Sequence, residues 1–269
     1  MGISPKDICL GLEEVRKTSP LVHNITNYVV MNTTANALLA VGASPVMAHA
    51  VEEVEDMTSL ARALVINIGT LSERWVEAMI SSARKADELG IPVVLDPVGA
   101  GATSYRTETC HTLLDSCTPA VIRGNASEIM ALATGAAKTK GVDSSDPSEA
   151  ALEAAKRLNE NTGSTVCISG AVDYIVDGDR VISVKNGHPM MACITGMGCT
   201  SSALCGAFVA VNSSFPDAAA EAMTVMGIAG EIAAERCKGP SSMQIAFLDT
   251  LFCLSEDDIT RRVNAGENQ

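Results

Sequence analysis

Aromatic residues are scarce in this sequence. Phenylalanine, tryptophan and tyrosine together make up 3% of the 269 residues, and tryptophan occurs only once. Hydrophobic residues still account for 47% of the chain, which argues against a disordered protein. The core must therefore be built from Ala, Val, Ile, Leu and Met. Such a composition is typical of layered α/β proteins, whose buried strands are rich in aliphatic side chains.

Positive charge is also scarce. The chain has 19 Lys and Arg residues against 32 Asp and Glu residues, a net charge of −13 at pH 7. This balance disfavours nucleic acid and acidic membrane surfaces as partners, because both are negatively charged. It does not exclude ATP, since a phosphate site needs only local backbone N–H groups and one or two basic side chains.

Long apolar runs and paired cysteines are missing. The longest apolar stretch, Ala203–Val211, is about half the roughly 18 residues that a membrane span needs. Residues 1–10 include Lys6 and Asp7 and have no apolar segment of the secretory type. None of the nine cysteines forms a C-x-x-C pair, which disfavours a disulfide framework or a zinc site. We expect a cytoplasmic protein with reduced cysteines and no membrane partner.

Helical and strand patterns alternate along the chain. Strands are predicted at 45–48, 64–68, 91–95, 120–122 and 165–169, with a hairpin over 174–184. Helices are predicted at 5–17, 29–39, 52–61, 73–89 and 148–158, with shorter or less bounded ones from 125, 199, 216 and 242. This alternation predicts a mostly parallel sheet covered on both faces. The most loop-like stretch, 141–147, is too short for a domain linker, so we expect one domain over residues 1–269.

Polar and glycine-rich segments follow four of these strands. They are Asn67–Thr70, Asp96–Gly101, Arg123–Asn125 and Ser169–Gly170. In parallel sheets, ligands bind beyond the carboxyl ends of the strands. We therefore expect these four loops to share one rim of the sheet and to form the site.

The most specific pattern is Gly196-Met197-Gly198-Cys199 before a predicted helix. Two glycines let the backbone approach a ligand closely, and the helix start offers free N–H groups and partial positive charge. This arrangement suits the negative charge of a transferring phosphoryl group, although an ordinary helix start without a ligand fits as well. At a helix start the Cys199 thiol can have a depressed pKa and act as a weak base; alternatively it only fills space.

Two carboxylates belong to the predicted rim. Asp96 and Glu128 fit a Mg²⁺ ion bound to phosphates, because this ion prefers oxygen ligands and keeps several waters. Each also has a structural explanation, since Glu128 can complete a helix cap with Asn125 and Asp96 can serve the turn before Pro97. No Walker A sequence is present, so the chain is not a P-loop enzyme.

Arg123 and Ser169 also follow predicted strands. Arg123 is either a nucleotide-phosphate contact or a solvated surface residue. Ser169 can bond the same nucleotide or stabilise a turn. The segment His23–Asn27 is unusually polar, and Met47 ends a strand where a core role is the default for methionine.

These segments resemble one known family. Leu21–Asn27 and Gly42–Met47, with Thr33 and Asn36, are similar to the N-terminal signature of hydroxyethylthiazole kinases. Later motifs of that family resemble residues 95–100, 123–129 and 195–199, in the same order. The resemblance covers roughly residues 10 to 255. Met197 departs from the family's usual Thr or Ser, and Ser169 stands where Thr is common.

The resemblance implies a ribokinase-like three-layer α/β/α sandwich with no separate lid domain. It implies ATP-dependent phosphorylation of 5-(2-hydroxyethyl)-4-methylthiazole in thiamine biosynthesis, with Mg²⁺, by a homotrimer whose active sites lie at subunit interfaces. By matched position, the thiazole contacts are Met47, Gly196 and Asn27, the ATP contacts are Arg123, Ser169 and Asn125, the metal residues are Asp96 and Glu128, and the catalytic group is Cys199 with Gly196 and Gly198. Cys199 matches the aspartate base of related sugar kinases.

Three other functions remain open from the sequence. The chain could be a ribokinase-like kinase of another small heterocyclic alcohol, which substrate profiling separates. It could be a thiol enzyme with Cys199 as nucleophile, although no histidine lies near Cys199 in the sequence. It could also be a thiazole-binding protein without turnover, which the retained Gly196, Gly198, Asp96 and Glu128 argue against.

Overall fold

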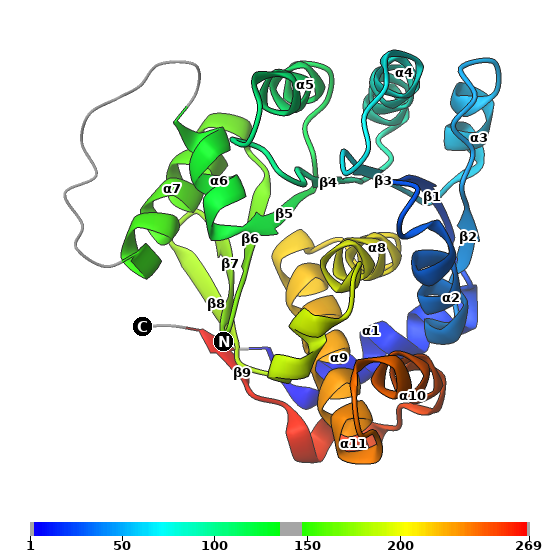
Figure 1. Ribbon diagram of the computed structural model, residues 1–269, viewed down its shortest axis with the longest axis vertical. Coiled ribbons are helices and arrows are strands. Elements are labelled where there is room, and N and C mark those ends of the chain that lie inside the picture. The colour runs from blue at the N-terminus through cyan, green and yellow to red at the C-terminus, as the bar shows by residue number, and fades with distance from the viewer. Residues whose placement is uncertain (1–2, 135–146, 268–269) are drawn as a thin grey trace.

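The computed structural model describes residues 3–134 and 147–267. Within these ranges the strands form one sheet in the order β2-β1-β3-β4-β5-β6-β7-β8-β9 (Figure 1). In chain order they are β1 (Leu21–Ile25), β2 (Ser44–Val46), β3 (Ala63–Asn67), β4 (Val93–Asp96), β5 (Val121–Asn125), β6 (Thr165–Ser169), β7 (Asp173–Asp177), β8 (Arg180–Val184) and β9 (Ala265–Glu267).

The first six strands are parallel, and the last three continue the sheet in antiparallel fashion. This confirms the mostly parallel sheet predicted from the sequence. Because parallel strands run in one direction, the carboxyl ends of β1 to β6 lie along the same edge. We call this edge the rim.

Helices cover both faces of the sheet (Figure 1). One face carries α3 (Val54–Leu60), α4 (Glu73–Leu89), α5 (Ser104–Leu114), α6 (Ala126–Ala133) and α7 (Pro147–Thr162). The other carries α1 (Pro5–Thr18), α2 (Met31–Val41), α8 (Met197–Val209), α9 (Phe215–Arg236), α10 (Pro240–Cys253), α11 (Glu256–Arg262) and the 3-10 helix η1 (Pro189–Cys193).

Successive side chains of a strand point to opposite faces of the sheet. Aliphatic side chains point to both faces here, so each face has its own core. In β3, Ala63 and Val65 join the core beneath α8, whereas Leu64 and Ile66 join the core beneath α4. The molecule is thus a three-layer α/β/α sandwich with two aliphatic cores, as predicted. No helix in the described ranges combines the length and apolar composition needed to cross a membrane.

Helix ends follow the local signals in the sequence. Ser4 caps α1 through reciprocal hydrogen bonds with Asp7. Gly42 and Gly90 end α2 and α4 in the left-handed conformation that glycine adopts without strain. The predicted ends at these glycines are confirmed.

Some elements differ from the prediction. The polar segment at His23 is the strand β1, the second from the sheet edge, and α5 was not predicted at all. The strand predicted as buried near residue 45 is β2, which is half-buried because it lies at the sheet edge with one neighbour. A fourth helix, α11, and β9 follow the three helices expected at the end of the chain. Residues 141–146 of the predicted loop lie outside the described ranges.

Candidate active site

The four polar loops predicted to share a rim do so. They lie at the carboxyl ends of β3, β4, β5 and β6, which are neighbours in the sheet. Arg123–Asn125, expected to follow a strand, forms the last three residues of β5. Asn67 is aligned with Asp96 across β3 and β4, and Asn125 with Ser169 across β5 and β6. The strand order therefore brings together residues that are about 100 positions apart in the sequence.

The start of α8 packs closely against this rim. Gly196 precedes the helix with a φ of +84°, a left-handed conformation that other residues adopt at a cost. A side chain at Gly198 would begin 2.9 Å from Nη1 of Arg123, so it would displace the guanidinium from its present position. Further along, Gly206 lets α8 pack directly on Val65 of β3. Gly198 and Gly206 thus allow the first turn of α8, with its unsatisfied N–H groups, to lie close to Arg123.

A ring of hydrogen bonds joins α8 to the ends of three strands. Asn27 Nδ2 donates to Cys199 Sγ at 3.4 Å and to Asn67 Oδ1 at 2.8 Å. Asn67 Nδ2 donates in turn to Asp96 Oδ2 at 2.6 Å, which also accepts from Ser202 Oγ at 2.8 Å. The ring begins and ends on α8, so it fixes the helix start relative to Asn27 and Asp96. We call these five residues the polar ring.

Burial controls protonation within the polar ring. Desolvation raises the pKa of Asp96 to about 6, although the positive charge of Arg123 opposes the shift. Desolvation, followed by the negative charge of Asp96, raises the pKa of the Cys199 thiol to about 11. Of the two interpretations that the sequence left open for Cys199, the raised pKa favours a thiol that does not act as a base. Burial outweighs the helix start, and the thiol is neutral at physiological pH.

Glu128 forms the helix cap that the sequence also allowed. Its Oε2 accepts the N–H of Asn125 at 2.8 Å, while the Asn125 side chain accepts the N–H of Glu128 at 3.0 Å. The second oxygen, Oε1, accepts the N–H of Gly99 at 2.8 Å. Glu128 therefore joins the loop after β4 to the start of α6, in addition to capping the helix.

Asp96 and Glu128 are the two rim carboxylates that could hold Mg²⁺. No cluster of three or more His, Cys, Asp or Glu side chains in the described ranges could hold an ion by itself. Asp96 and Glu128 are close enough for the charge of Glu128 to raise the pKa of Asp96. Mg²⁺ commonly uses one or two carboxylates and takes its other ligands from waters and substrate phosphates. The pair fits an ion that arrives with a nucleotide.

Arg123 is not a solvated surface residue. Its side chain is buried, and Nη2 donates to Ser169 Oγ at 2.6 Å. Its Nε has no hydrogen-bond partner among the described residues. Arg123 and Ser169 line a cavity of about 560 Å³ together with Gly198 and apolar side chains such as Met191 and Met226. Asp173, Asn186 and His188 also line the cavity, so it combines a buried cation with further polar groups and an apolar surface. Such a mixed lining suits a ligand that has both an anionic and an apolar group.

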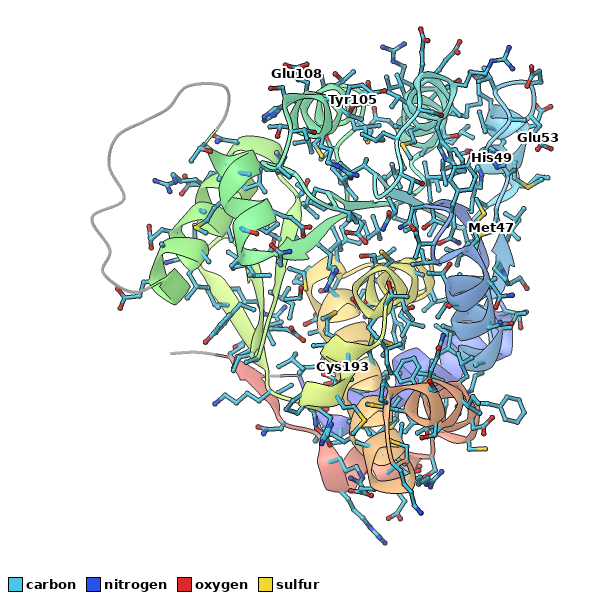
Figure 2. The ribbon with its side chains drawn as sticks, in the orientation of Figure 1. Met47, His49, Glu53, Tyr105, Glu108 and Cys193 are labelled. Atoms are coloured by element: carbon cyan, nitrogen blue, oxygen red, sulfur yellow. The ribbon has the colours of Figure 1, made fainter. Side chains whose placement is uncertain are left out.

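Met47 lies beside the edge strand β2, whereas the polar ring joins the segments at the ends of β1, β3 and β4 to α8. Met47 follows β2, and Figure 2 shows it on the same side of the molecule as His49. The residue after Met47, Ala48, is bonded to His23, whose Nε2 lies 2.8 Å from the carbonyl oxygen of Ala48. Met47 is half-buried rather than part of the core.

An aromatic cluster occupies the same end of the rim. The rings of His49 and Trp75 are stacked with their centroids 4.4 Å apart, and Tyr28 meets Trp75 edge-on at 4.4 Å. Trp75 is buried, whereas Tyr28 and His49 are exposed. The cluster joins the chain segments that follow β1 and β2.

The sequence did not identify three residues of the site. Asn67 was recognised only as part of a rim segment, and its amide proved to be the centre of the polar ring. Ser202 could have been found from its spacing of one helical turn after Gly198. Arg106 lies on the unpredicted helix α5, and nothing in its sequence neighbourhood pointed to the rim.

The architecture defines a class of proteins. A pyridoxal kinase from Staphylococcus aureus in complex with AMP-PCP superposes with a TM-score of 0.60 at 14% identity, over 79% of this chain and 88% of that one. A pyridoxal kinase from Bacillus subtilis, as an ADP complex, gives 0.57 at 17% identity, over 78% and 91%. The fold is ribokinase-like.

Closer relatives identify the family. The profile of the hydroxyethylthiazole kinase family matches residues 12–257. Hydroxyethylthiazole kinase from Syntrophus aciditrophicus is 59% identical, over 99% of this chain and all of that protein, and the Leptospira biflexa enzyme is 56% identical over 97% of each. The structure of hydroxyethylthiazole kinase from Pyrococcus horikoshii gives a TM-score of 0.91 at 45% identity, over 98% and 100%. The chain belongs to the hydroxyethylthiazole kinase family and is an enzyme.

Proposed function

We propose that this enzyme transfers the terminal phosphoryl group of ATP to the hydroxyl of 5-(2-hydroxyethyl)-4-methylthiazole, a salvage step of thiamine biosynthesis, in the cytoplasm. The observation that carries the proposal is the polar ring, which fixes the N-terminus of α8 beside the buried Arg123. Phosphoryl transfer depends mainly on positioning and on stabilisation of negative charge. A rigid helix start next to a buried cation supports both.

Each end of the site has a proposed ligand. Asn27, Gly196 and Met47 would contact the thiazole, with the Asn27 amide and the Cys199 thiol near its hydroxyl. Asn125, Arg123 and Ser169 would contact the nucleotide. The hydrogen bond from Arg123 to Ser169 supports a common role for the last two residues.

Charge would be stabilised by several groups at once. The N–H groups at Gly198 and the guanidinium of Arg123 would face the transferring phosphoryl group. Asp96 and Glu128 would hold Mg²⁺ through its bound waters, and the ion when bound would neutralise phosphate oxygens. Because the transition state is loose, a strong base is not needed, and Cys199 would orient the hydroxyl as a neutral thiol. The raised pKa of Cys199 supports this role.

We also propose that the enzyme is a homotrimer with its active sites at subunit interfaces. Large apolar side chains next to the polar ring support this arrangement. Tyr28 and Val29, which directly follow Asn27, are 66% and 63% exposed. A second subunit covering them would also close the thiazole end of the site.

The direct test is mass-spectrometric detection of product after incubation of the purified protein with Mg-ATP and the thiazole alcohol. We expect a mass gain of one phosphoryl group that requires both protein and Mg²⁺. A Gly198→Val variant is the matched control, because its side chain would collide with Arg123 at the centre of the site. Well-folded wild-type protein that phosphorylates only another heterocyclic alcohol, or that binds the thiazole without turnover, would contradict the proposal.

A further inference from the structure

Arg106 of α5 forms hydrogen bonds to the backbone of two rim loops. Its Nη1 donates to the carbonyl oxygens of Ile68 at 2.8 Å and Val98 at 2.7 Å. Its Nη2 donates to the carbonyl oxygen of Gly69 at 2.9 Å. One guanidinium therefore connects the loop after β3 with the loop after β4. No carboxylate in the described ranges forms an ion pair with Arg106, so these carbonyl groups are its main partners there.

The same two loops use their N–H groups for the candidate active site. The N–H of Gly69 donates to Asn67 Oδ1 at 2.9 Å, which is the acceptor that Asn27 also uses. The N–H of Gly99 donates to Glu128 Oε1 at 2.8 Å. Each loop thus binds Arg106 through carbonyl groups and the site through N–H groups. A displacement at Arg106 would reach both the polar ring and Glu128.

The shape of the loops requires this particular side chain. A Cβ added at Gly99 would lie 3.2 Å from Cδ of Arg106, so the glycine leaves room for the arginine stem. Only a guanidinium presents several N–H groups in a planar fork that can reach three carbonyl oxygens from one position. A lysine ammonium would reach one loop and leave carbonyl groups of the other without a partner.

We propose that Arg106 is a positioning residue for phosphoryl transfer, which rests on the proposed function of the same site. It sets the separation of the loops after β3 and β4 and thereby the geometry of Asn67, Asp96 and Glu128. Arg106 does not contact the reacting groups. Its loss should lower turnover more than substrate binding, because misplacement of a catalytic array mainly affects the transition state.

The experiment is chemical rescue. We expect Arg106→Ala to lower kcat by about 100-fold while the KM values for ATP and the thiazole alcohol change less than about threefold. Guanidinium at tens of millimolar, far below unfolding concentrations, should restore kcat in a saturable manner, whereas equal NaCl should not. Arg106→Lys should retain an intermediate kcat. Retention of wild-type kcat by folded Arg106→Ala would overturn the proposal.

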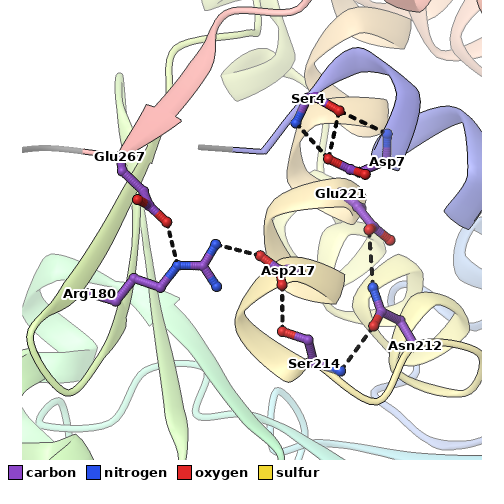
Figure 3. A network of polar contacts seen from close by, with 8 residues as sticks. All are labelled: Ser4, Asp7, Arg180, Asn212, Ser214, Asp217, Glu221 and Glu267. Atoms are coloured by element: carbon purple, nitrogen blue, oxygen red, sulfur yellow. Dashed lines mark hydrogen bonds and ion pairs between the residues drawn. The ribbon is translucent and has the colours of Figure 1, made fainter. Parts of the chain in front are cut away.

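Arg180→Ala is the matched control for loss of a half-buried arginine. Arg180 bonds Asp217 and Glu267, both at 2.6 Å (Figure 3). It is the first residue of β8, and none of these partners belongs to the rim loops. We expect it to lower thermal stability while folded protein keeps its kcat and gains nothing from guanidinium. Equal guanidinium rescue of both variants would show a general effect of the additive and would overturn the positioning role.

Hydrogen exchange tests the proposal independently of turnover. The N–H groups of Gly69 and Gly99 should exchange faster in Arg106→Ala, and guanidinium should restore their protection. If the wild-type protein has no kinase activity on the thiazole, the proposed function fails, yet this measurement still decides whether Arg106 fixes the two loops. Unchanged protection at both glycines would overturn the inference. If Arg106→Ala does not fold, Arg106→Lys serves for the same measurement.

Discussion

Cys199 lies at the start of a helix, where a thiolate would be favoured, yet burial raises its pKa to about 11. A neutral thiol cannot remove a proton effectively at pH 7. We therefore expect Cys199→Ala to lower kcat by less than about tenfold, whereas loss of a true general base costs about 100-fold or more. Steady-state kinetics of the purified variant would check this. A folded Cys199→Ala protein without measurable activity would refute the positional role.

Gly198→Val provides the comparison at the neighbouring residue. Its side chain would begin 2.9 Å from Nη1 of Arg123, so either the guanidinium or the helix start must move. We expect a much larger loss of kcat than for Cys199→Ala, because one of the two charge-stabilising groups is displaced from the other. Similar losses in the two variants would mean that the helix start has no special role.

Single residues also show how far the sequence could predict the site. Asp96, Glu128, Arg123 and Ser169 were found because each follows an apolar strand, and strand ends in parallel sheets converge. Their hydrogen-bond partners could not be found in this way. The bond between Asn27 and Asn67 spans 40 positions, and Arg106 acts through backbone groups that leave no trace in side-chain identity. Protonation was also unpredictable, since it depends on burial.

At the scale of elements, β1 and α5 show why some segments were missed. β1 carries His23 and Asn24, which are polar but buried. Burial of His23 is possible because its ring forms hydrogen bonds with Thr58 and with the carbonyl oxygen of Ala48. A strand with such polar residues does not have the apolar run used for prediction. Most residues of α5 are polar, and only a few of them are buried. Its apolar residues therefore do not recur with a clear helical period, which is the signal used to predict a helix. Strands with aliphatic runs, such as β6, were predicted with correct bounds.

Helix α9 contains a buried carboxyl group that should make stability depend on pH. Glu221 accepts a hydrogen bond from Asn212 at 3.0 Å, and its Oε2 faces Gly11 of α1 without a hydrogen-bond partner in the described ranges (Figure 3). Burial raises its pKa from 4.5 to about 8. The folded state therefore binds a proton more tightly than the unfolded state. This contribution to stability is fully present below about pH 4.5 and is lost as the pH rises towards 8.

Glu221→Gln should remove this dependence. The amide oxygen keeps the bond from Asn212, and the residue cannot ionise. We expect the Tm of the variant, relative to the wild type, to rise between about pH 4.5 and pH 8, by the equivalent of about 1.4 kcal/mol for each unit of pKa shift at most. Thermal unfolding of both proteins at several pH values measures this difference in Tm. A constant difference in Tm across this range would contradict a raised pKa at Glu221.

At the scale of the whole molecule, the described surface has apolar side chains that a subunit contact would cover. Tyr28 and Val29 are exposed next to the polar ring. We expect light scattering to give a mass about three times the 27.9 kDa of one chain. Val29→Arg should dissociate the trimer and lower activity together. Leu89→Arg is the control, because Leu89 is exposed at the far end of α4, away from the rim. A monomeric, fully active wild-type enzyme would contradict the interface.

The sequence predicted the three layers and the rim well, because they follow from alternating apolar patterns. It could not predict assembly from these patterns, since an exposed Tyr28 and a buried one look the same in a sequence. Met47 illustrates the same limit. Its match to a family motif assigns a role, yet in the single chain it lies at the sheet edge, separated from β3 by β1.

The stacked cluster of His49, Trp75 and Tyr28 has a practical consequence for spectroscopy. Trp75 is the only tryptophan in the chain, and its ring is buried between two exposed neighbours. All indole fluorescence therefore originates from one point, beside the segments that follow β1 and β2. A molecule that covers Tyr28 or His49 would change the surroundings of this indole and shift its emission. The protein thus contains a built-in optical reporter for events at that end of the rim, with no added label.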